Sequence, residues 1–313
     1  MSSPRSEAPA GTAPRDLAAL RALAVGRPPA RLAVVCADDG VALEAVAIAV
    51  ELGIVAPVLF GDPAAIEAKA PAALLDPCEL VAAGSAQDAA RLASRAAGAG
   101  DVDVLMKGAL RTDQLLRAAL SADAGLRTGR RLSDVAFYDD RVQGAPRLVG
   151  VTDGGLSIAP TLADKRDIVR NAAAVLHRLG FARPRIAIMS ATEAVTDAMP
   201  STLDARTLTE EGARGEFGDC DVYGPLALDN ALSPAAAAAK GIDHPVAGHA
   251  DCLVAASIEA GNHLGKAAKY LAGSVLGHVI AGARVPILIP SRVESAEDKL
   301  TSICLGVICS ADD

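Results

Sequence analysis

The chain has 313 residues, of which 51% are hydrophobic, and a formal net charge of −8. Alanine supplies much of the apolar fraction, and no uninterrupted apolar run reaches membrane-spanning length, so we expect no membrane contact. The acidic balance, the 2% aromatic content and the lack of tryptophan argue against nucleic-acid binding, because they offer neither a basic surface nor a stacking platform. An anionic substrate would therefore need positive charge concentrated at its site.

The N-terminal segment is small, polar and proline-rich, and it lacks the apolar core of a signal peptide. We expect residues 1–14 to form a disordered tail. Six cysteines are scattered without a C-x-x-C motif, and several lie inside apolar runs, as Cys36 does in LAVVCA. This usage favours reduced, buried thiols in a cytoplasmic protein over a disulfide framework.

Strand-like apolar runs alternate with alanine-rich helical stretches along almost the whole chain. The strand candidates are residues 32–37, 55–60, 80–83, 102–106, 135–138, 147–151, 185–189, 219–222, 252–255, 276–281 and 285–289. The main helix candidates are residues 41–52, 86–97, 112–120, 162–179, 202–212 and 259–272. Such alternation predicts an α/β fold of mostly parallel sheets flanked by helices.

The length of the chain favours two lobes. The best boundary is the stretch VGVTDGG at residues 149–155, because its glycines follow a strand and suit a hinge. The C-terminal strand and helix resemble elements of the N-terminal half. We therefore expect a first lobe of residues 15–150 plus 283–313, a second of residues 151–282, and the active cleft between them.

The C-terminal segment is the most informative part of the chain. The apolar run 285–289 stops at Pro290, and polar residues including Ser291, Arg292 and Glu294 lead into a helical pattern. A strand that ends in a polar turn before a helix is where open α/β sheets bind ligands, and an arginine there can grip a phosphate or carboxylate. The alternative is that Ser291 or Ser295 caps the helix while Arg292 pairs with Glu294.

Common catalytic motifs are missing. No G-x-G-x-x-G follows a strand, so a dinucleotide site is unsupported. The segment AGNHLGK at 260–266 lacks parts of a P-loop, and GLSIA at 155–159 lacks the last glycine of a nucleophile elbow. The histidines have no spacing typical of zinc ligands, so we expect no metal site.

Several collinear segments resemble the phosphate acetyl/butyryl transferase family. They are MKGA at 106–109, IAPTLADK at 158–165, PSTLDA at 200–205, GPLALDNA at 224–231, EAGN at 259–262 and GARVP at 282–286, followed by Ser291-Arg292. The resemblance covers roughly residue 100 to the C-terminus. It implies a two-lobed fold similar to the isocitrate and isopropylmalate dehydrogenases, in a homodimer or higher homo-oligomer. Members move an acyl group between coenzyme A and inorganic phosphate, so the small-molecule substrates would be acyl-CoA and phosphate, with no permanently bound cofactor.

The resemblance also implies roles for individual residues. Ser291, Arg292 and Asp298 fall on positions used in the acetyl branch for catalysis and for contacts with phosphoryl or carbonyl groups. The implied substrate-binding positions are Arg117, Lys107, Gly224, Asp229, Asn230, Gly248, Glu259, Gly261 and Asn262. The alternative is that the three glycines only end strands and helices and that Asn230, Glu259 and Asn262 are loop caps. Asp298 is similar to the acetyl branch, whereas the MKGALRTDQLLR and GARVPILIPSR segments look closer to the butyryl branch and to the transferase half of bifunctional hydratase–transferases.

Two residues depart from the family pattern. Asp134 stands where close relatives often have histidine, and His249 stands where they vary. Both leave the choice between acetyl and butyryl substrates open.

The chemistry of this family is attack of the coenzyme A thiol on an acyl phosphate. Asp298 is the candidate base, although its unperturbed pKa lies about 4.6 units below that of a thiol, which makes simple proton transfer uphill by roughly 6 kcal/mol. Either partial burial of Asp298 or concerted proton loss beside Arg292 would close this gap. A metal-dependent dicarboxylate dehydrogenase and a catalytically silent homologue that binds coenzyme A are the alternatives.

Overall fold

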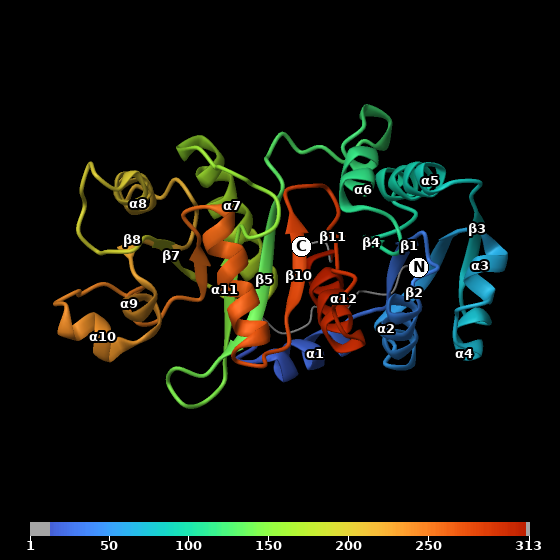
Figure 1. The fold of residues 1–313 in the computed structure, drawn as a ribbon, viewed down its shortest axis with the longest axis horizontal. Helices are drawn as coiled ribbons and strands as arrows, with labels where there is room; N and C mark the ends of the chain where they lie inside the picture. The colour runs from blue at the N-terminus through green and yellow to red at the C-terminus, as the bar shows by residue number, and fades with distance from the viewer. Residues whose placement is uncertain (1–12, 311–313) are drawn as a thin grey trace, which may run out of the picture.

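Strands and helices alternate along the chain as the sequence predicts (Figure 1). The computed structural model describes residues 13–310, so the predicted tail, apart from residues 13 and 14, lies outside the described residues. The strands are β1 (Ala30–Val35), β2 (Val55–Gly61), β3 (Glu79–Ala82), β4 (Val104–Lys107), β5 (Ser133–Asp140), β6 (Arg147–Thr152), β7 (Arg185–Met189), β8 (Asp221–Leu226), β9 (Cys252–Val254), β10 (Gly277–Ala281) and β11 (Ile287–Leu288). Every strand predicted from the sequence overlaps one of these.

The helices include all those predicted and several short ones that were not. They are α1 (Leu17–Val25), α2 (Gly40–Glu51), α3 (Pro63–Glu67), α4 (Ala72–Leu75), α5 (Ala86–Ala99), α6 (Thr112–Ala119), the 3-10 turn η1 (Ala122–Ala124), α7 (Leu162–Arg178), α8 (Pro200–Ala213), α9 (Leu228–Leu232), α10 (Pro234–Ala239), α11 (Ile258–Tyr270) and α12 (Ala296–Ser310). Within residues 13–310, none of these helices has the length and apolar character needed to cross a bilayer.

The strands form one sheet in the order β3-β2-β1-β4-β11-β10-β5-β6-β9-β7-β8. The pairs β11–β10, β10–β5 and β5–β6 are antiparallel, and all other neighbours are parallel. The prediction of a mostly parallel sheet flanked by helices is therefore confirmed. The antiparallel pairs at the centre of the sheet were not predicted, because the sequence of an apolar strand does not show whether its neighbour runs parallel or antiparallel to it.

Helices cover both faces of the sheet. On one face, α2, α12 and α7 pack into a large apolar cluster with side chains of β1, β4, β7 and β10. On the other face, α5 and α6 pack over the first half of the sheet, and α10 and α11 contribute to a third cluster over the second half. Side-chain caps begin several of these helices, as Asp39 does for α2 by accepting a hydrogen bond from the Ala42 N–H at 3.1 Å.

Helix α12 lies at the centre of this architecture. Its residues from Asp298 to Ile308 are all buried, and it packs against α1, α2 and β10. Gly306 lets the helix approach the sheet, since a Cβ there would lie 2.9 Å from a methyl group of Val104. The first turn also buries two charged residues, Asp298 and Lys299, beneath the loop that follows β11.

Backbone hydrogen bonds connect the carboxyl ends of the neighbouring strands β1 and β4. The Gly108 N–H donates to the Val35 carbonyl and the Ala109 N–H to the Cys36 carbonyl, both at 2.8 Å. A Cβ on Gly108 would lie 2.1 Å from the Cys36 carbonyl oxygen, where no side chain fits. This contact fixes the position of the preceding residue, Lys107.

We expect Gly108→Ala to lower the free energy of unfolding by about 1–3 kcal/mol, the usual cost of overpacking a tight site. Gly26→Ala is the matched control, because its nearest atoms would be 3.7 Å away and its φ of −76° suits any residue. Chemical denaturation of both variants measures the difference. Equal unfolding free energies for the two variants would mean that the backbone between β1 and β4 accommodates the added methyl group without loss of stability.

Candidate active site

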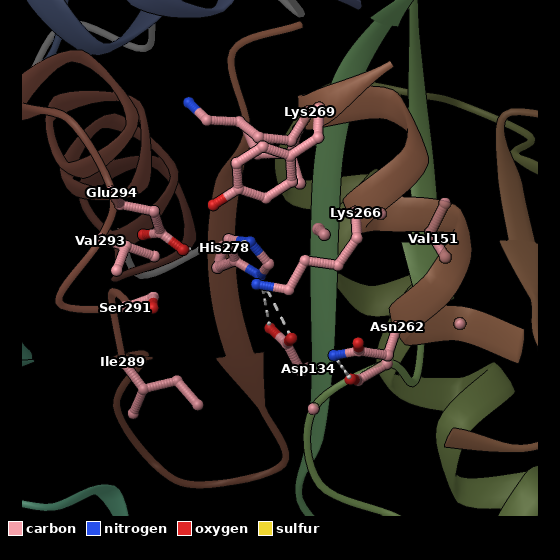
Figure 2. A pocket seen from close by; sticks show the side chains of 17 residues that line it. Asp134, Val151, Asn262, Lys266, Lys269, His278, Ile289, Ser291, Val293 and Glu294 are labelled. Atoms are coloured by element: carbon pink, nitrogen blue, oxygen red, sulfur yellow. Dashed lines mark hydrogen bonds and ion pairs between the residues drawn. The ribbon is translucent and has the colours of Figure 1, made fainter. Parts of the chain in front are cut away.

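Two adjoining hollows form one cleft at the segment between β11 and α12. The smaller, about 250 Å³, lies between this segment, strands β5 and β10, and helix α11 (Figure 2). The wider, about 710 Å³, opens toward the loop between β4 and α6. Gly155, Ile289 and Ser291 line both hollows, so Ser291 stands at their junction.

The segment from Ser291 to Ser295 has the predicted strand–turn–helix arrangement. Ser295 starts α12, since its hydroxyl accepts a hydrogen bond from the Asp298 N–H at 3.2 Å. Among residues 13–310, Arg292 makes no ion pair with Glu294, whose carboxylate lies instead near His278. The alternative was therefore right about the capping serine and wrong about the arginine pair. Arg292 lines the wider hollow.

Three cations gather at this junction. Lys107 is 6% exposed and Lys299 is 1% exposed, and the Lys299 ammonium donates to the Ser291 carbonyl at 2.8 Å. Burial lowers the pKa of Lys107, and the charges of Lys299 and Arg292 lower it further. None of the three has a carboxylate within 4 Å among the described residues. Cations that lie beside a cleft without a carboxylate within 4 Å are suited to binding an anion.

The sequence did not single out Lys299, although it singled out its neighbour Asp298. Lysine is common in the first turn of a helix, and its burial here depends on α12 lying against the sheet. No local signal in the sequence distinguishes it from a surface lysine.

Asp298 is completely buried and hydrogen-bonded on all sides. Its carboxylate pairs with the Lys269 ammonium and accepts hydrogen bonds from the Leu276 N–H at 3.0 Å, the Ser295 hydroxyl at 2.6 Å and the Ser295 N–H at 2.9 Å. Burial alone would raise the pKa of Asp298, but the hydrogen bonds from Lys269 and Ser295 hold that pKa below its usual value. The carboxylate thus joins α11, β10 and α12.

A second charged group in the smaller hollow was not predicted. The His278 Nδ1 lies 3.2 Å from an Asp134 carboxylate oxygen, and its Nε2 lies 3.9 Å from Glu294. Figure 2 shows this pair between the 289–294 segment and α11, from which Lys266 points into the same space. Although burial lowers the pKa of His278, Asp134 and then Glu294 raise it to about 9.

In the sequence, His278 was assessed only as a metal ligand, and Asp134 was noted only as a departure from the family pattern. The two lie 144 positions apart in the sequence and meet because β10 and β5 are neighbours. Within residues 13–310, no group of three or more histidine, cysteine or acidic side chains is placed to hold a metal ion.

Two of the predicted binding residues on α11 line the smaller hollow. Gly261 packs on the Asp153–Gly154 backbone, where a Cβ would lie 2.8 Å from the Asp153 carbonyl oxygen. The Asn262 side chain donates to the Gly154 carbonyl at 3.1 Å. With Lys107, these residues are brought together with Ser291 and Arg292 around the cleft.

The glycines of the predicted hinge have a different explanation from the one expected. Neither Gly154 nor Gly155 has a positive φ. A Cβ on Gly154 would lie 2.8 Å from the Gly261 carbonyl carbon, and one on Gly155 would lie 2.7 Å from the Asp134 carboxylate. Close packing, rather than unusual backbone angles, requires glycine here.

Four other predicted binding residues line neither hollow. Gly224 meets the Ile188 carbonyl in the sheet, and Gly248 meets Pro234 with a φ of +76°. Asp229 is exposed and lies 3.5 Å from the Lys240 ammonium, while Asn230 is buried in α9. Close packing accounts for the two glycines and a surface ion pair for Asp229, whereas the buried Oδ1 of Asn230 has no hydrogen-bond partner among the described residues.

The last two predicted binding residues are exposed on the helices α11 and α6. Glu259 is exposed in the first turn of α11, where a hydrogen bond from Ser257 lowers its pKa. Arg117 is exposed on α6 and lies 3.5 Å from Asp113, which lines the wider hollow. Neither lines a hollow itself.

Comparison with known proteins identifies the relatives of the chain. Residues 79–307 match the family described as Phosphate acetyl/butaryl transferase. The chain is 40% identical over 284 residues to a phosphate acetyltransferase of Rickettsia typhi, covering 90% of this chain and 81% of that protein. It is 44% identical over 235 residues to a probable phosphate butyryltransferase of Bacillus subtilis, covering 75% and 78%.

A solved structure shares the fold. The crystal structure of a branched-chain phosphotransacylase from Enterococcus faecalis V583 superposes with a TM-score of 0.80 at 28% sequence identity. The match covers 90% of this chain and 99% of that one.

We expect Asp298→Asn to lower the unfolding free energy by about 2 kcal/mol, because it breaks the capping box and leaves Lys269 without its anion. The contribution from the ionised carboxylate is present at neutral pH and is lost as pH falls below about 4, since the folded-state pKa is depressed. Glu297→Gln is the control, as Glu297 is exposed and makes only a surface pair with Arg21. Thermal unfolding of both variants tests this. An unchanged melting temperature for Asp298→Asn would contradict the structural role.

Proposed function

The chain belongs to the phosphate acetyl/butaryl transferase family, and we propose that it transfers a short acyl group, from acetyl to butyryl, reversibly between coenzyme A and inorganic phosphate. The observation that carries the proposal is Ser291 at the junction of two hollows, with Arg292 and the buried Lys107 beside it. The enzyme is a phosphate acyltransferase with acyl-CoA and phosphate as its small-molecule substrates. It uses no permanently bound cofactor.

The phosphoryl group binds at the cluster of cations. Arg292 grips two of its oxygens, because a guanidinium presents parallel donors that match a phosphate. Lys107 supplies a buried point charge, and Lys299 holds the carbonyl of Ser291 so that the serine hydroxyl is positioned. The hydroxyl donates to the acyl phosphate as charge develops on it.

Coenzyme A binds across the rest of the cleft. The faces of α11 and α6 that border the hollows carry Lys266, Asn262 and, at the outer edge, Arg117. Cations on a cleft rim attract an anionic substrate from solution. Glu259 lies at the N-terminal end of the same α11 surface. Gly224, Asp229, Asn230 and Gly248 support the second half of the fold that carries this surface.

The reaction is direct attack of the thiol on the acyl carbon. The S–C bond forms, the C–O bond to phosphate breaks, and the thiol proton ends on the released phosphate. Asp298 was predicted to be the base, and this role stays a prediction. The hydrogen bonds that lower its pKa widen the gap of roughly 6 kcal/mol to a thiol. In the observed arrangement, the carboxylate accepts a proton only after giving up Lys269 or Ser295.

The first lobe comprises residues 15–150 plus 283–313 and the second residues 151–282, in an arrangement like that of the isocitrate and isopropylmalate dehydrogenases. The cleft then lies where β11 and the 289–294 segment of one lobe meet α11 of the other. Closure of the lobes excludes water from the acyl phosphate. We place the enzyme in the cytoplasm as a homodimer or higher homo-oligomer.

The decisive assay incubates the protein with phosphate and acetyl-, propionyl- or butyryl-CoA and follows the released thiol. We expect turnover without nicotinamide cofactor or added metal, with acyl phosphate formed in equal amount. Trapping the acyl phosphate as its hydroxamate separates transfer from simple thioester hydrolysis. Thiol release without acyl phosphate would overturn the proposed function.

We expect Arg292→Lys to reduce kcat/KM for phosphate by more than about tenfold, since a point charge cannot replace a bidentate grip. Arg95→Lys is the control, because Arg95 lies on α5 and forms an exposed ion pair with Asp123 of η1. Steady-state kinetics with varied phosphate measures the effect. Unchanged phosphate kinetics would show that Arg292 does not contact the phosphoryl group.

A further inference from the structure

We propose that His278, held by Asp134, is a catalytic residue that carries the proton between the coenzyme A thiol and phosphate. The proposal rests on the proposed acyl transfer and names the proton-transfer group within that site. Both residues line the smaller hollow together with Ser291. The imidazole is thus in the same cavity as the hydroxyl that stands at the junction.

The sheet fixes the position of the pair. Strands β10 and β5 are antiparallel neighbours in which His278 is opposite Ala136 and Ile280 is opposite Asp134. His278 and Asp134 are therefore diagonal neighbours on one face of the sheet, within reach of each other. The absence of a side chain at Gly155 leaves room for the Asp134 carboxylate, since a Cβ there would lie 2.7 Å from its oxygen.

The hydrogen bonding leaves one ring nitrogen for substrate. Nδ1 lies 3.2 and 3.3 Å from the two Asp134 oxygens, which makes it the nitrogen that donates to the carboxylate. Nε2 is 3.9 Å from Glu294, beyond hydrogen-bonding distance. The His278 side chain lines the smaller hollow and is 20% exposed. An oriented imidazole with one nitrogen available is the arrangement of a general acid–base catalyst.

Other candidates for proton transfer are less suitable. The Asp298 carboxylate is fully buried and accepts hydrogen bonds from Lys269, Ser295 and Leu276. Lys269 is occupied by Asp298. Glu294 has one carboxylate oxygen that is buried without a hydrogen-bond partner, and burial raises its pKa. It lies on the far side of the imidazole from Asp134, where its charge stabilises the protonated ring.

The proton balance closes in both directions. When acyl-CoA reacts, a phosphate oxygen bonds to the acyl carbon and the C–S bond breaks. The imidazolium gives its Nε2 proton to the leaving thiolate, and the proton lost by hydrogen phosphate returns to the imidazole. In reverse, the imidazolium gives its proton to the leaving phosphate and the ring takes the thiol proton as the sulfur attacks, so the ring ends in its starting form. No oxidant, reductant or covalent acyl-enzyme is needed.

The surroundings determine which form is present at neutral pH. The groups that face the ring are Asp134 from β5, Glu294 from the 289–294 segment, and Lys266, Lys269 and Tyr270 from α11. The two carboxylates outweigh burial and Lys266 and raise the pKa of His278 to about 9, close to the value of about 8.5 for a free thiol. Proton exchange between groups of similar pKa is efficient.

The first test replaces His278 by alanine. We expect kcat in the thiol-release assay to fall by about 10²-fold or more, with KM for acyl-CoA little changed, and added imidazole to restore about tenfold of the loss. His263→Ala is the matched control, because His263 is exposed on α11 and does not line the hollow. A His278→Ala enzyme that keeps turnover within about threefold of the parent would overturn the proposal.

The second test uses Asp134→Asn and the alkaline side of the pH profile. With acyl-CoA and phosphate, no free thiol is present at the start, so the loss of kcat/KM on raising the pH reports proton loss from the cations of the site, which are the imidazolium and Lys107 with its lowered pKa. The part of this loss that shifts in Asp134→Asn reports the imidazolium, because Asp134 acts on the pKa of His278. We expect this loss near pH 9 in the parent and at lower pH in Asp134→Asn, because a carboxylate that raises the histidine pKa has been removed. If the alkaline loss of kcat/KM occurs at the same pH in Asp134→Asn as in the parent, the proposal is overturned, even if His278→Ala fails to fold.

The two proposals fail in different ways. If the parent protein made no acyl phosphate, the proposed function would fall. An active parent whose turnover is insensitive to His278→Ala would leave the function in place and remove His278 from the proton transfer. NMR titration of the parent and the His278→Ala variant assigns the imidazole signal and checks its pKa without any turnover.

Discussion

The buried ion pair between Asp298 and Lys269 is the interaction on which the candidate site depends. A carboxylate with no exposed surface is tolerable only if donors surround it, and here the donors come from α11, from the start of β10 and from the cap of α12. Two of these elements, α11 and β10, border the smaller hollow, and the third, α12, directly follows the 289–294 segment that forms another of its walls. The same charge that closes the capping box therefore fixes the distance between the segment carrying Ser291 and the helix that faces it.

Around this anchor the cleft divides into two chemically different ends. Lys107, Arg292 and Lys299 gather where β4 and β11 end side by side, so cations without carboxylate partners lie at the carboxyl edge of parallel strands, a usual position for ligands. Across the Ser291 junction, Asp134 and Glu294 flank His278. An acyl phosphate spanning the junction would place its phosphoryl group among the cations and its reacting carbonyl toward the proton-transfer end.

Sequence patterns predicted the strands, the longer helices and the strand–turn–helix segment around Ser291, because each rests on local periodicity and turn chemistry. They could not predict the antiparallel centre of the sheet, since strand pairing is a tertiary property. His278 was overlooked for that reason: its meaning depends on Asp134, which only the β10–β5 pairing brings near. Conversely, Gly224 and Gly248 stand in segments that resemble the family, yet each is explained by a close backbone contact away from the cleft.

Glycines connect the packing of the fold to the chemistry of the site. Gly154 allows the β6–α7 connection to touch α11 at Gly261, and Gly155 allows the same connection to lie against the Asp134 carboxylate. A side chain at either position would move one wall of the hollow, and the imidazole with it. Asp134 orients the His278 ring, and the backbone at Gly155 in turn fixes the position of the Asp134 carboxylate. That backbone packs on α11 at Gly261, and α11 is tied to Asp298 by Lys269. The positions of the capping carboxylate and of the imidazole are therefore coupled, although the two groups do not touch.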